Sequence, residues 1–154
     1  MHIKGFEEAT WKEMLREAKA RVVKPEHEII ASDISPAAVE AAKKNAEFAG
    51  VAGLVDFSVC DFRETKLPPP PGTIMLNPEY GFRLGDEAEL APVYRAIGDF
   101  FKQKCSGFMG HVFTGNLKLA REIGLRSKRR LTFFNGGLEC RLLVFELYAG
   151  TRNP

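Results

Sequence analysis

Cysteine is scarce in this 154-residue chain, and its few thiols follow no ligand pattern. Cys60, Cys105 and Cys140 lie far apart in the sequence and are odd in number. No pair has the spacing of a metal site, and an odd count argues against a disulfide framework. We therefore predict free thiols, buried in the protein, in a reducing cytoplasm.

Long apolar runs and a strong excess of one charge are also absent. No segment approaches the roughly 18 apolar residues of a membrane-spanning helix, and residues 1–8 lack the apolar centre of a secretory signal. The net charge of +2 gives no global case for nucleic acid. Locally, residues 121–130 hold five Lys or Arg against Glu122 alone, which suits a phosphate backbone but also a solvated helix end and loop.

The chain contains a regular alternation of helix and strand patterns. Its residues are 45% hydrophobic, which suits one domain over residues 1–154. We expect helices at 7–22, 35–49, 87–104 and 116–123, and strands at 28–33, 54–60, 73–76, 107–114, 128–134 and 139–147. Such alternation predicts an α/β fold with a parallel sheet and helices on both faces. The turn at 135–137, Asn-Gly-Gly, predicts a closing antiparallel hairpin.

The most informative stretch joins the strand at 73–76 to the turn Asn77-Pro78-Glu79-Tyr80. Pro78 cannot donate to a sheet, so the strand must end there. The amide oxygen of Asn77 and the Pro78 carbonyl can accept hydrogen bonds from an amine, and the Tyr80 ring can stack on a flat base. A plain strand-ending turn with a surface tyrosine is the alternative.

Two acids follow other predicted strands. Asp33 and Asp61 each come at a strand end, and parallel strands deliver such ends to one edge of the sheet, where ligands bind. Asp33 could accept the two hydroxyls of a ribose, and Asp61 the amino group of an adenine. Each could instead cap a helix. For Asp33, the Ser35-Pro36 pair two residues later is a helix start.

Residues 77–84, NPEYGFRL, resemble the NPPYGxRL signature of S-adenosylmethionine-dependent amino-methyltransferases. The wider pattern resembles the guanine-N2 methyltransferases of large-subunit ribosomal RNA, which usually carry an RNA-binding THUMP domain upstream. The supporting segments span nearly the whole chain and are 32–33, 43–50, 60–62, 114–116 and 135–142.

The resemblance implies a Rossmann-like class I methyltransferase fold, S-adenosyl-L-methionine as cofactor, and guanine N2 of 23S ribosomal RNA as the target. The implied catalytic residues are Asn77, Pro78 and Tyr80, which would hold the amine and stack on the flipped-out base. The implied cofactor-binding residues are Asp33, Ile34, Asp61, Phe62 and Asn77. The implied RNA contacts are Arg83, Lys128, Arg129, Arg130 and Asn135.

Three departures from the family pattern stand out. Glu79 replaces the second proline of the signature, and Phe82 replaces a residue that is commonly acidic. The glycine-rich loop that follows the family's first strand is absent from this sequence. We therefore expect the C-terminal part of a methyltransferase domain, whose missing first strand would lie between the strands ending at Asp33 and Asn77. The isolated chain should then bind S-adenosylmethionine weakly or not at all.

Two other functions fit the same residues. NPxY turns also serve N6-adenine methyltransferases that act on DNA or RNA. Alternatively, Glu79 and the missing loop favour a non-catalytic RNA-binding fragment whose surface is the basic run at 121–130.

Overall fold

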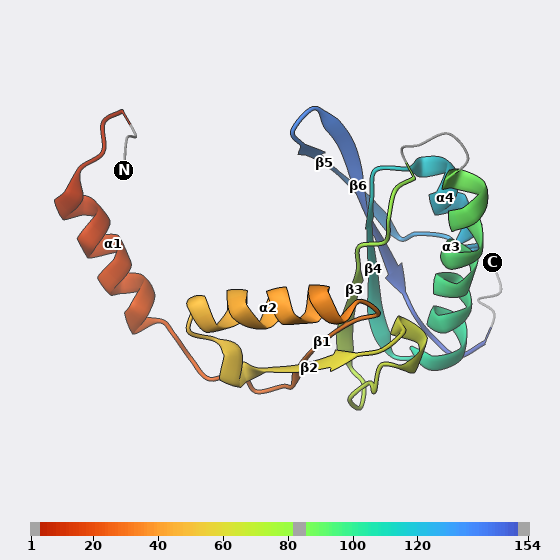
Figure 1. Cartoon of the computed structure of the whole chain (residues 1–154), viewed down its shortest axis with the longest axis horizontal. Helices are drawn as coiled ribbons and strands as arrows, with labels where there is room; N and C mark the ends of the chain where they lie inside the picture. Colours follow the sequence, from red (N-terminus) through yellow and green to blue (C-terminus); the bar gives the residue numbers. More distant parts are fainter. Residues whose placement is uncertain (1–3, 82–85, 151–154) are drawn as a thin grey trace.

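A computed structural model describes residues 4–81 and 86–150 (Figure 1). Its helices are α1 (Glu8–Ala20), α2 (Pro36–Phe48), α3 (Asp86–Lys104) and α4 (Leu117–Glu122), with short 3-10 turns η1 (Ala52–Leu54) and η2 (Phe62–Glu64). Its strands are β1 (Ile29–Asp33), β2 (Val55–Val59), β3 (Gly72–Leu76), β4 (Phe108–Thr114), β5 (Arg129–Asn135) and β6 (Leu138–Glu146). Each expected helix and strand is present within one or two residues of its predicted bounds.

The strands form two sheets with different strand directions. β1 and β2 make a parallel pair, whereas the second sheet has the order β3-β4-β6-β5. β3 and β4 are parallel, and β6 runs antiparallel to both β4 and β5. The predicted hairpin is confirmed, because Asn135 pairs with Leu138 and Gly136 adopts the positive φ of 60° that its tight turn requires.

The two sheets are not joined through their facing strands. Among the described strands, β1 pairs only with β2, and β3 pairs only with β4. The other edge of β1 and the other edge of β3 therefore carry no strand. This is the interruption expected for a sheet that lacks a strand between Asp33 and Asn77. The α/β fold is therefore present, with its sheet divided at that point.

The main core lies between the four-stranded sheet and α3 (Figure 1). Alternate residues of β4 point into it, and Phe108, Val112 and Thr114 are buried. Among its described residues, helix α3 contributes four buried hydrophobic side chains, which are Tyr94, Ile97, Phe100 and Phe101. Helix α2 packs instead against β1 and β2. Its predicted start is confirmed, since the Ser35 hydroxyl accepts a hydrogen bond from the Ala38 N–H at 3.3 Å.

Helix α1 stands apart from the rest of the molecule (Figure 1). None of its residues is buried, although its sequence has the apolar periodicity of a packed helix. Ion pairs along its surface, such as Lys12 with Glu8 at 2.7 Å, contribute only a few tenths of a kcal/mol each. The prediction of a helix is thus confirmed, but its apolar stripe covers nothing in the described chain.

The three thiols are free, as predicted, but not all are buried. Cys105 and Cys140 are buried, whereas Cys60 is only half-buried. Burial raises the pKa of Cys105 to about 11, so this thiol stays protonated at neutral pH. No helix in the described part of the chain is long and apolar enough to cross a membrane.

Candidate functional site

The turn after β3 holds its amide and its aromatic ring against each other. The Tyr80 hydroxyl donates a hydrogen bond to Asn77 Oδ1 at 2.8 Å. The Tyr80 ring lies edge-on to Phe113 of β4, with 6.4 Å between ring centroids, and partial burial raises the pKa of Tyr80. The Asn77 oxygen, which is predicted to accept from an amine, is therefore bound to the hydroxyl of Tyr80, whose ring is predicted to stack on the base. An incoming base would have to replace this hydrogen bond.

The backbone of the same turn is held by residues that the sequence did not single out as site residues. Tyr94 of α3 is fully buried and donates a hydrogen bond to the Glu79 carbonyl at 3.0 Å. Its hydroxyl also lies 2.8 Å from Thr114 Oγ1 at the end of β4. Asn116 Nδ2 donates to the Tyr80 carbonyl at 2.9 Å. The turn is thus fixed from α3 and from the β4–α4 loop, so Glu79 in place of proline does not leave it unsupported.

Gly115 allows the turn and the β5–β6 hairpin to approach each other. A Cβ atom at this position would lie 2.9 Å from Leu138 Cδ2 and 3.0 Å from Tyr80 Cδ2, which is too close without a shift of these side chains.

The sequence carries a general signal for each of the two residues that hold the turn. A buried tyrosine needs a polar partner for its hydroxyl. An asparagine directly before a helix is a common N-cap. These were the sequence signals for Tyr94 and Asn116, but neither signal identifies the carbonyl that each residue binds.

Asp33 ends β1, stabilises the turn before α2 and keeps one carboxylate oxygen available. Its Oδ1 accepts a hydrogen bond from the Ser35 N–H at 2.7 Å, but the N-cap of α2 is Ser35 and not Asp33. Its Oδ2 has no partner among the described residues, and the side chain is exposed. Ile34 next to it is 70% exposed. Asp33 can therefore cap the turn and still accept a hydroxyl, and Ile34 offers an apolar surface.

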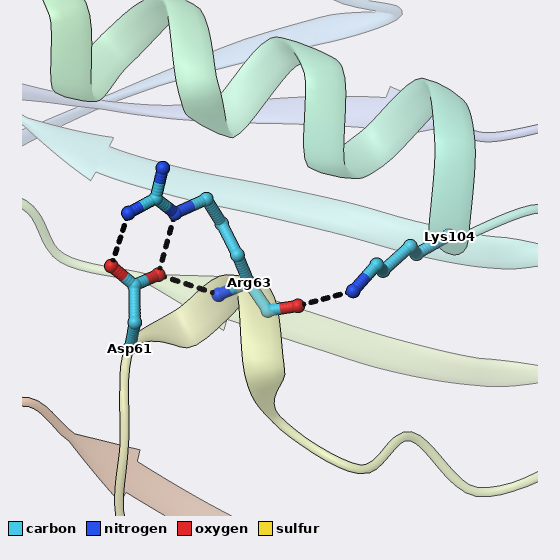
Figure 2. A network of polar contacts seen from close by, with 3 residues as sticks. All are labelled: Asp61, Arg63 and Lys104. Atoms are coloured by element: carbon cyan, nitrogen blue, oxygen red, sulfur yellow. Dashed lines mark hydrogen bonds and ion pairs between the residues drawn. The ribbon is translucent and has the colours of Figure 1, made fainter.

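Asp61 binds a neighbouring arginine, Arg63, which is not among the predicted site residues (Figure 2). Arg63 donates from Nε and Nη2 to the two carboxylate oxygens at 2.8 and 2.7 Å, and its backbone N–H donates to Oδ1 at 2.8 Å. The Arg63 carbonyl in turn accepts from Lys104 Nζ at 2.6 Å. The hydrogen bonds from the Arg63 side chain and backbone lower the pKa of Asp61 to about 2.

Phe62 packs inward rather than presenting its ring at the end of the strand. Its ring meets Phe100 of α3 edge-on, with 5.5 Å between centroids. It also lines a groove of about 960 Å³ between β1 and β3. Asp33 and Asp61 therefore lie on one side of this groove and Asn77 on the other, so the two halves of the predicted site belong to different sheets.

Four of the predicted RNA contacts lie in or next to the β5–β6 hairpin, and the fifth lies outside the described residues. Lys128 donates to Glu146 at 2.7 Å and Arg130 to Ser127 at 2.9 Å, while Arg129 has no partner among the described residues. Strand β5 lies three strands from β3, or about 14 Å at the usual strand spacing. Asn135 lies at the tip of the hairpin. Because β5 runs in the same direction as β4, Asn135 lies at the same edge of the sheet as Asn77. Arg83 lies outside the described residues.

The chain matches one protein family along most of its length. A family model described as RMKL-like, methyltransferase domain, matches residues 1–143. The ribosomal RNA large subunit methyltransferase K/L of Shewanella baltica is 35% identical, over 97% of this chain and 22% of that protein. The protein of the same name from Chromohalobacter salexigens is 35% identical, over 94% of this chain and 21% of that protein. The chain thus spans about a fifth of the length of these relatives.

Solved structures share the fold. A Clostridium difficile 630 protein described as a possible methylase is 25% identical with a TM-score of 0.80, over 96% of this chain and 39% of that one. SMU.472, a methyltransferase in complex with SAH, is 23% identical with a TM-score of 0.79, over 97% and 39%. A predicted N6-adenine-specific DNA methylase from Listeria monocytogenes is 23% identical with a TM-score of 0.74, over 96% and 37%.

Proposed function

Because the chain belongs to the RMKL-like methyltransferase domain family, we propose that it is part of an S-adenosylmethionine-dependent RNA methyltransferase. The proposed reaction is methylation of the exocyclic N2 amine of guanine in 23S ribosomal RNA. The observation that carries the proposal is the Asn77–Tyr80 turn, fixed at the carboxyl end of β3 by Tyr94 and Asn116. The names of the curated relatives support the choice of ribosomal RNA.

The residues of the chain fit the cofactor in part. Asp33 has a free carboxylate oxygen that suits a ribose hydroxyl, with the apolar Ile34 beside it. Asp61 can accept an adenine amino group only after Arg63 releases it, and the 59% exposure of the Arg63 side chain permits such a movement. Phe62 lies at the start of the same turn. When bound, S-adenosylmethionine supplies an electrophilic methyl group.

The proposed role of the turn is to hold the target amine and the base. Asn77 Oδ1 and the Pro78 carbonyl would accept the two amine hydrogens, which leaves the nitrogen lone pair directed at the methyl group. The Tyr80 ring would stack on the flipped-out guanine once its hydroxyl leaves Asn77. The nitrogen would gain the methyl group as the bond between that group and the cofactor sulfur breaks, and it would lose one proton to water. Correct positioning of the amine would supply much of the rate. No covalent link to the protein is required.

The surrounding partners follow from the same proposal. Arg83, Arg129 and Asn135 would contact the ribosomal RNA, and Lys128 and Arg130 would join them after leaving Glu146 and Ser127. The rest of the methyltransferase domain and a THUMP RNA-binding domain would belong to the longer protein. Residues 1–154 would then be one part of a single domain, working in the cytoplasm.

The test is a chimera in which this chain replaces the matched segment of the Shewanella baltica relative. We expect the chimera to bind S-adenosylmethionine and to form N2-methylguanine in ribosomal RNA, identified by mass spectrometry of nucleosides. Asn77→Ala should lower the rate by about 100-fold or more, whereas Asn45→Ala in α2 should not. Cofactor binding without methylation of any base would contradict the proposal.

Two competing functions give different results in the same assay. N6-methyladenine in RNA or DNA would assign the chain to the adenine methyltransferases, as the name of the Listeria neighbour suggests for that protein. A non-catalytic fragment is favoured by Glu79 and by the engagement of Asp61 with Arg63. It would bind ribosomal RNA with a steep dependence on salt, and neither bind the cofactor nor transfer a methyl group.

A further inference from the structure

Glu79 places a carboxylate inside the turn that is proposed to hold the target amine. It lies between Pro78 and Tyr80, and its side chain is exposed. Among the described residues, the only hydrogen bond of Glu79 is the one that its backbone carbonyl accepts from Tyr94. The carboxylate itself is therefore available to a ligand.

The backbone that carries this side chain is fixed. The buried Tyr94 hydroxyl donates to the Glu79 carbonyl at 3.0 Å, and Asn116 Nδ2 donates to the Tyr80 carbonyl at 2.9 Å. The amide oxygen of Asn116 caps α4, so the orientation of that amide is set as well. Because the backbone is held in place, only the side chain of Glu79 loses freedom when it binds a ligand.

Three successive residues of the turn offer hydrogen-bond acceptors. They are the Asn77 amide oxygen, the Pro78 carbonyl and the Glu79 carboxylate, and an ionised carboxylate can only accept. In the proposed function, the first two acceptors take the two hydrogens of the exocyclic amine. The carboxylate then remains for the ring position beside that amine.

Guanine and adenine differ at this ring position. In guanine, N1 carries a hydrogen next to the N2 amine, so the edge of the base presents three hydrogens in a row. In adenine, the N1 beside the amine has no hydrogen and is itself an acceptor. A flipped-out base is read along this edge. A carboxylate there gains a charge-assisted hydrogen bond from guanine but repels the N1 lone pair of adenine.

The charge of Glu79 favours a base over the RNA backbone as its partner. A carboxylate is repelled by phosphate groups, whereas a ring N–H donates to it. The methyltransferase signature has a proline at this position, and proline has no side-chain acceptor. The replacement of proline by glutamate therefore adds a contact that the signature turn cannot make.

We propose that Glu79 is a specificity-determining residue, which accepts a hydrogen bond from N1–H of the target guanine and thereby rejects adenine. The inference rests on the proposed function, because it requires a flipped-out base whose amine is held by Asn77 and Pro78. It gives this chain a means of choosing between two bases whose amines both fit an NPxY turn.

The test compares guanine with 2-aminopurine, which keeps the amine at C2 but has no hydrogen on N1. Binding is measured by fluorescence anisotropy with the full chain and with the chimera described above, using uridine oligomers that carry one guanine or one 2-aminopurine. Methyl transfer by the chimera is measured on ribosomal RNA fragments with either base at the methylated position. We expect both affinity and kcat/KM to favour guanine.

Glu79→Gln should reduce this preference by about tenfold or more, because a glutamine amide can turn and donate to the N1 of 2-aminopurine. Glu79→Pro, which keeps the carbonyl that Tyr94 binds, should reduce it as well. The matched control is Glu47→Gln, an exposed carboxylate of α2, which should leave the preference unchanged. The ratio between the two bases is the decisive quantity, since a merely structural role of Glu79 would lower both values equally.

The results separate this inference from the proposed function. N2-methylguanine formed with a preference that Glu79→Gln does not alter would overturn the inference and leave the function intact. A preference for guanine in binding that depends on Glu79, without methyl transfer, would support the inference and contradict the function. Equal affinities of the unmodified chain and chimera for the two oligomers would overturn the inference. Formation of N6-methyladenine would overturn both.

Discussion

Tyr94 illustrates how a residue in the core sets the shape of an exposed turn. Its ring belongs to the apolar face of α3, and its hydroxyl reaches both the Glu79 carbonyl and Thr114. Burial raises the pKa of Tyr94, so the hydroxyl remains a donor throughout the physiological range. Helical periodicity predicts the position of the ring, but the carbonyl it binds lies 15 residues away and depends on how the two elements pack.

We predict that Tyr94→Phe destabilises the chain by about 1–2 kcal/mol, because the Glu79 carbonyl loses a buried donor. Urea unfolding monitored by circular dichroism measures this change. Thr132→Val, which deletes an exposed hydroxyl on β5, is the matched control and should change stability by less than about 0.5 kcal/mol. Equal effects of the two variants would mean that Tyr94 does not hold the turn.

Asp61 makes part of the stability depend on acid pH. Its pKa is lowered from 3.8 to about 2 in the folded chain, so the stabilisation is fully present above about pH 4. It is lost as the pH falls from there towards 2, where the folded-state carboxylate takes up its proton. We expect about 1 kcal/mol from this pair, since the exposed Arg63 side chain is screened by solvent.

Unfolding free energies measured between pH 5 and pH 2 test this prediction. Asp61→Asn should remove about 1 kcal/mol at pH 5 and change stability little at pH 2. The control is Asp56→Asn, an exposed carboxylate on β2 without an ion pair among the described residues. A loss that is the same at both pH values would show that the Asp61 charge is not the cause.

At the scale of elements, the crossing of α3 and α4 depends on one glycine. A Cβ on Gly98 would lie 1.9 Å from the Ile123 carbonyl oxygen, which is backbone and cannot turn aside. Ile123 itself is buried and belongs to the same core cluster as Ile97. The helix pattern predicts α3 correctly, but a glycine inside a helix signals close packing without saying against what.

We predict that Gly98→Ala destabilises the chain by about 3 kcal/mol or more, because α4 must move away from α3. This reverses the usual sign, since alanine normally stabilises a helix by about 1 kcal/mol over glycine. Gly53→Ala is the control, because nothing lies within 4 Å of a Cβ at that position. Thermal unfolding of both variants measures the effect. An unchanged unfolding temperature for Gly98→Ala would contradict the close approach of α3 to the Ile123 carbonyl.

The difference between local sequence signals and contacts between elements explains how much of the fold and of the site the sequence could predict. Periodicity, caps and turn residues are local, so they were sufficient for the bounds of the elements, the Ser35 cap and the Gly136 turn. Asp33 and Asn77 could be placed at strand ends for the same reason. The pairing of Asp61 with Arg63 and the engagement of Asn77 by Tyr80 join residues two and three positions apart, but the sequence does not say that these side chains face each other. The distance of Arg129 from the turn depends on the order of the strands and has no local signal.

At the scale of the whole molecule, stability is concentrated in one part of the chain. The buried core joins α3, α4 and the four-stranded sheet, whereas β1, β2 and α2 contribute only two buried residues, Val39 and Ala46. Helix α1 contributes none. Buried packing therefore stabilises the N-terminal third less than the rest of the described chain.

We predict that deletion of residues 1–24 changes the free energy of unfolding of the isolated chain by less than about 0.5 kcal/mol, because no residue of α1 is buried. Denaturant unfolding of the shortened and full chains measures this difference. A large loss of stability in the isolated chain would show that α1 already packs against it.

The free edges of β1 and β3 also have a consequence for the behaviour of the isolated chain in solution. Unpaired edges beside an apolar groove join readily to any extended chain, including other copies in an aggregate. We therefore expect the isolated chain to aggregate more readily as its concentration rises than a chain whose strand edges are all paired.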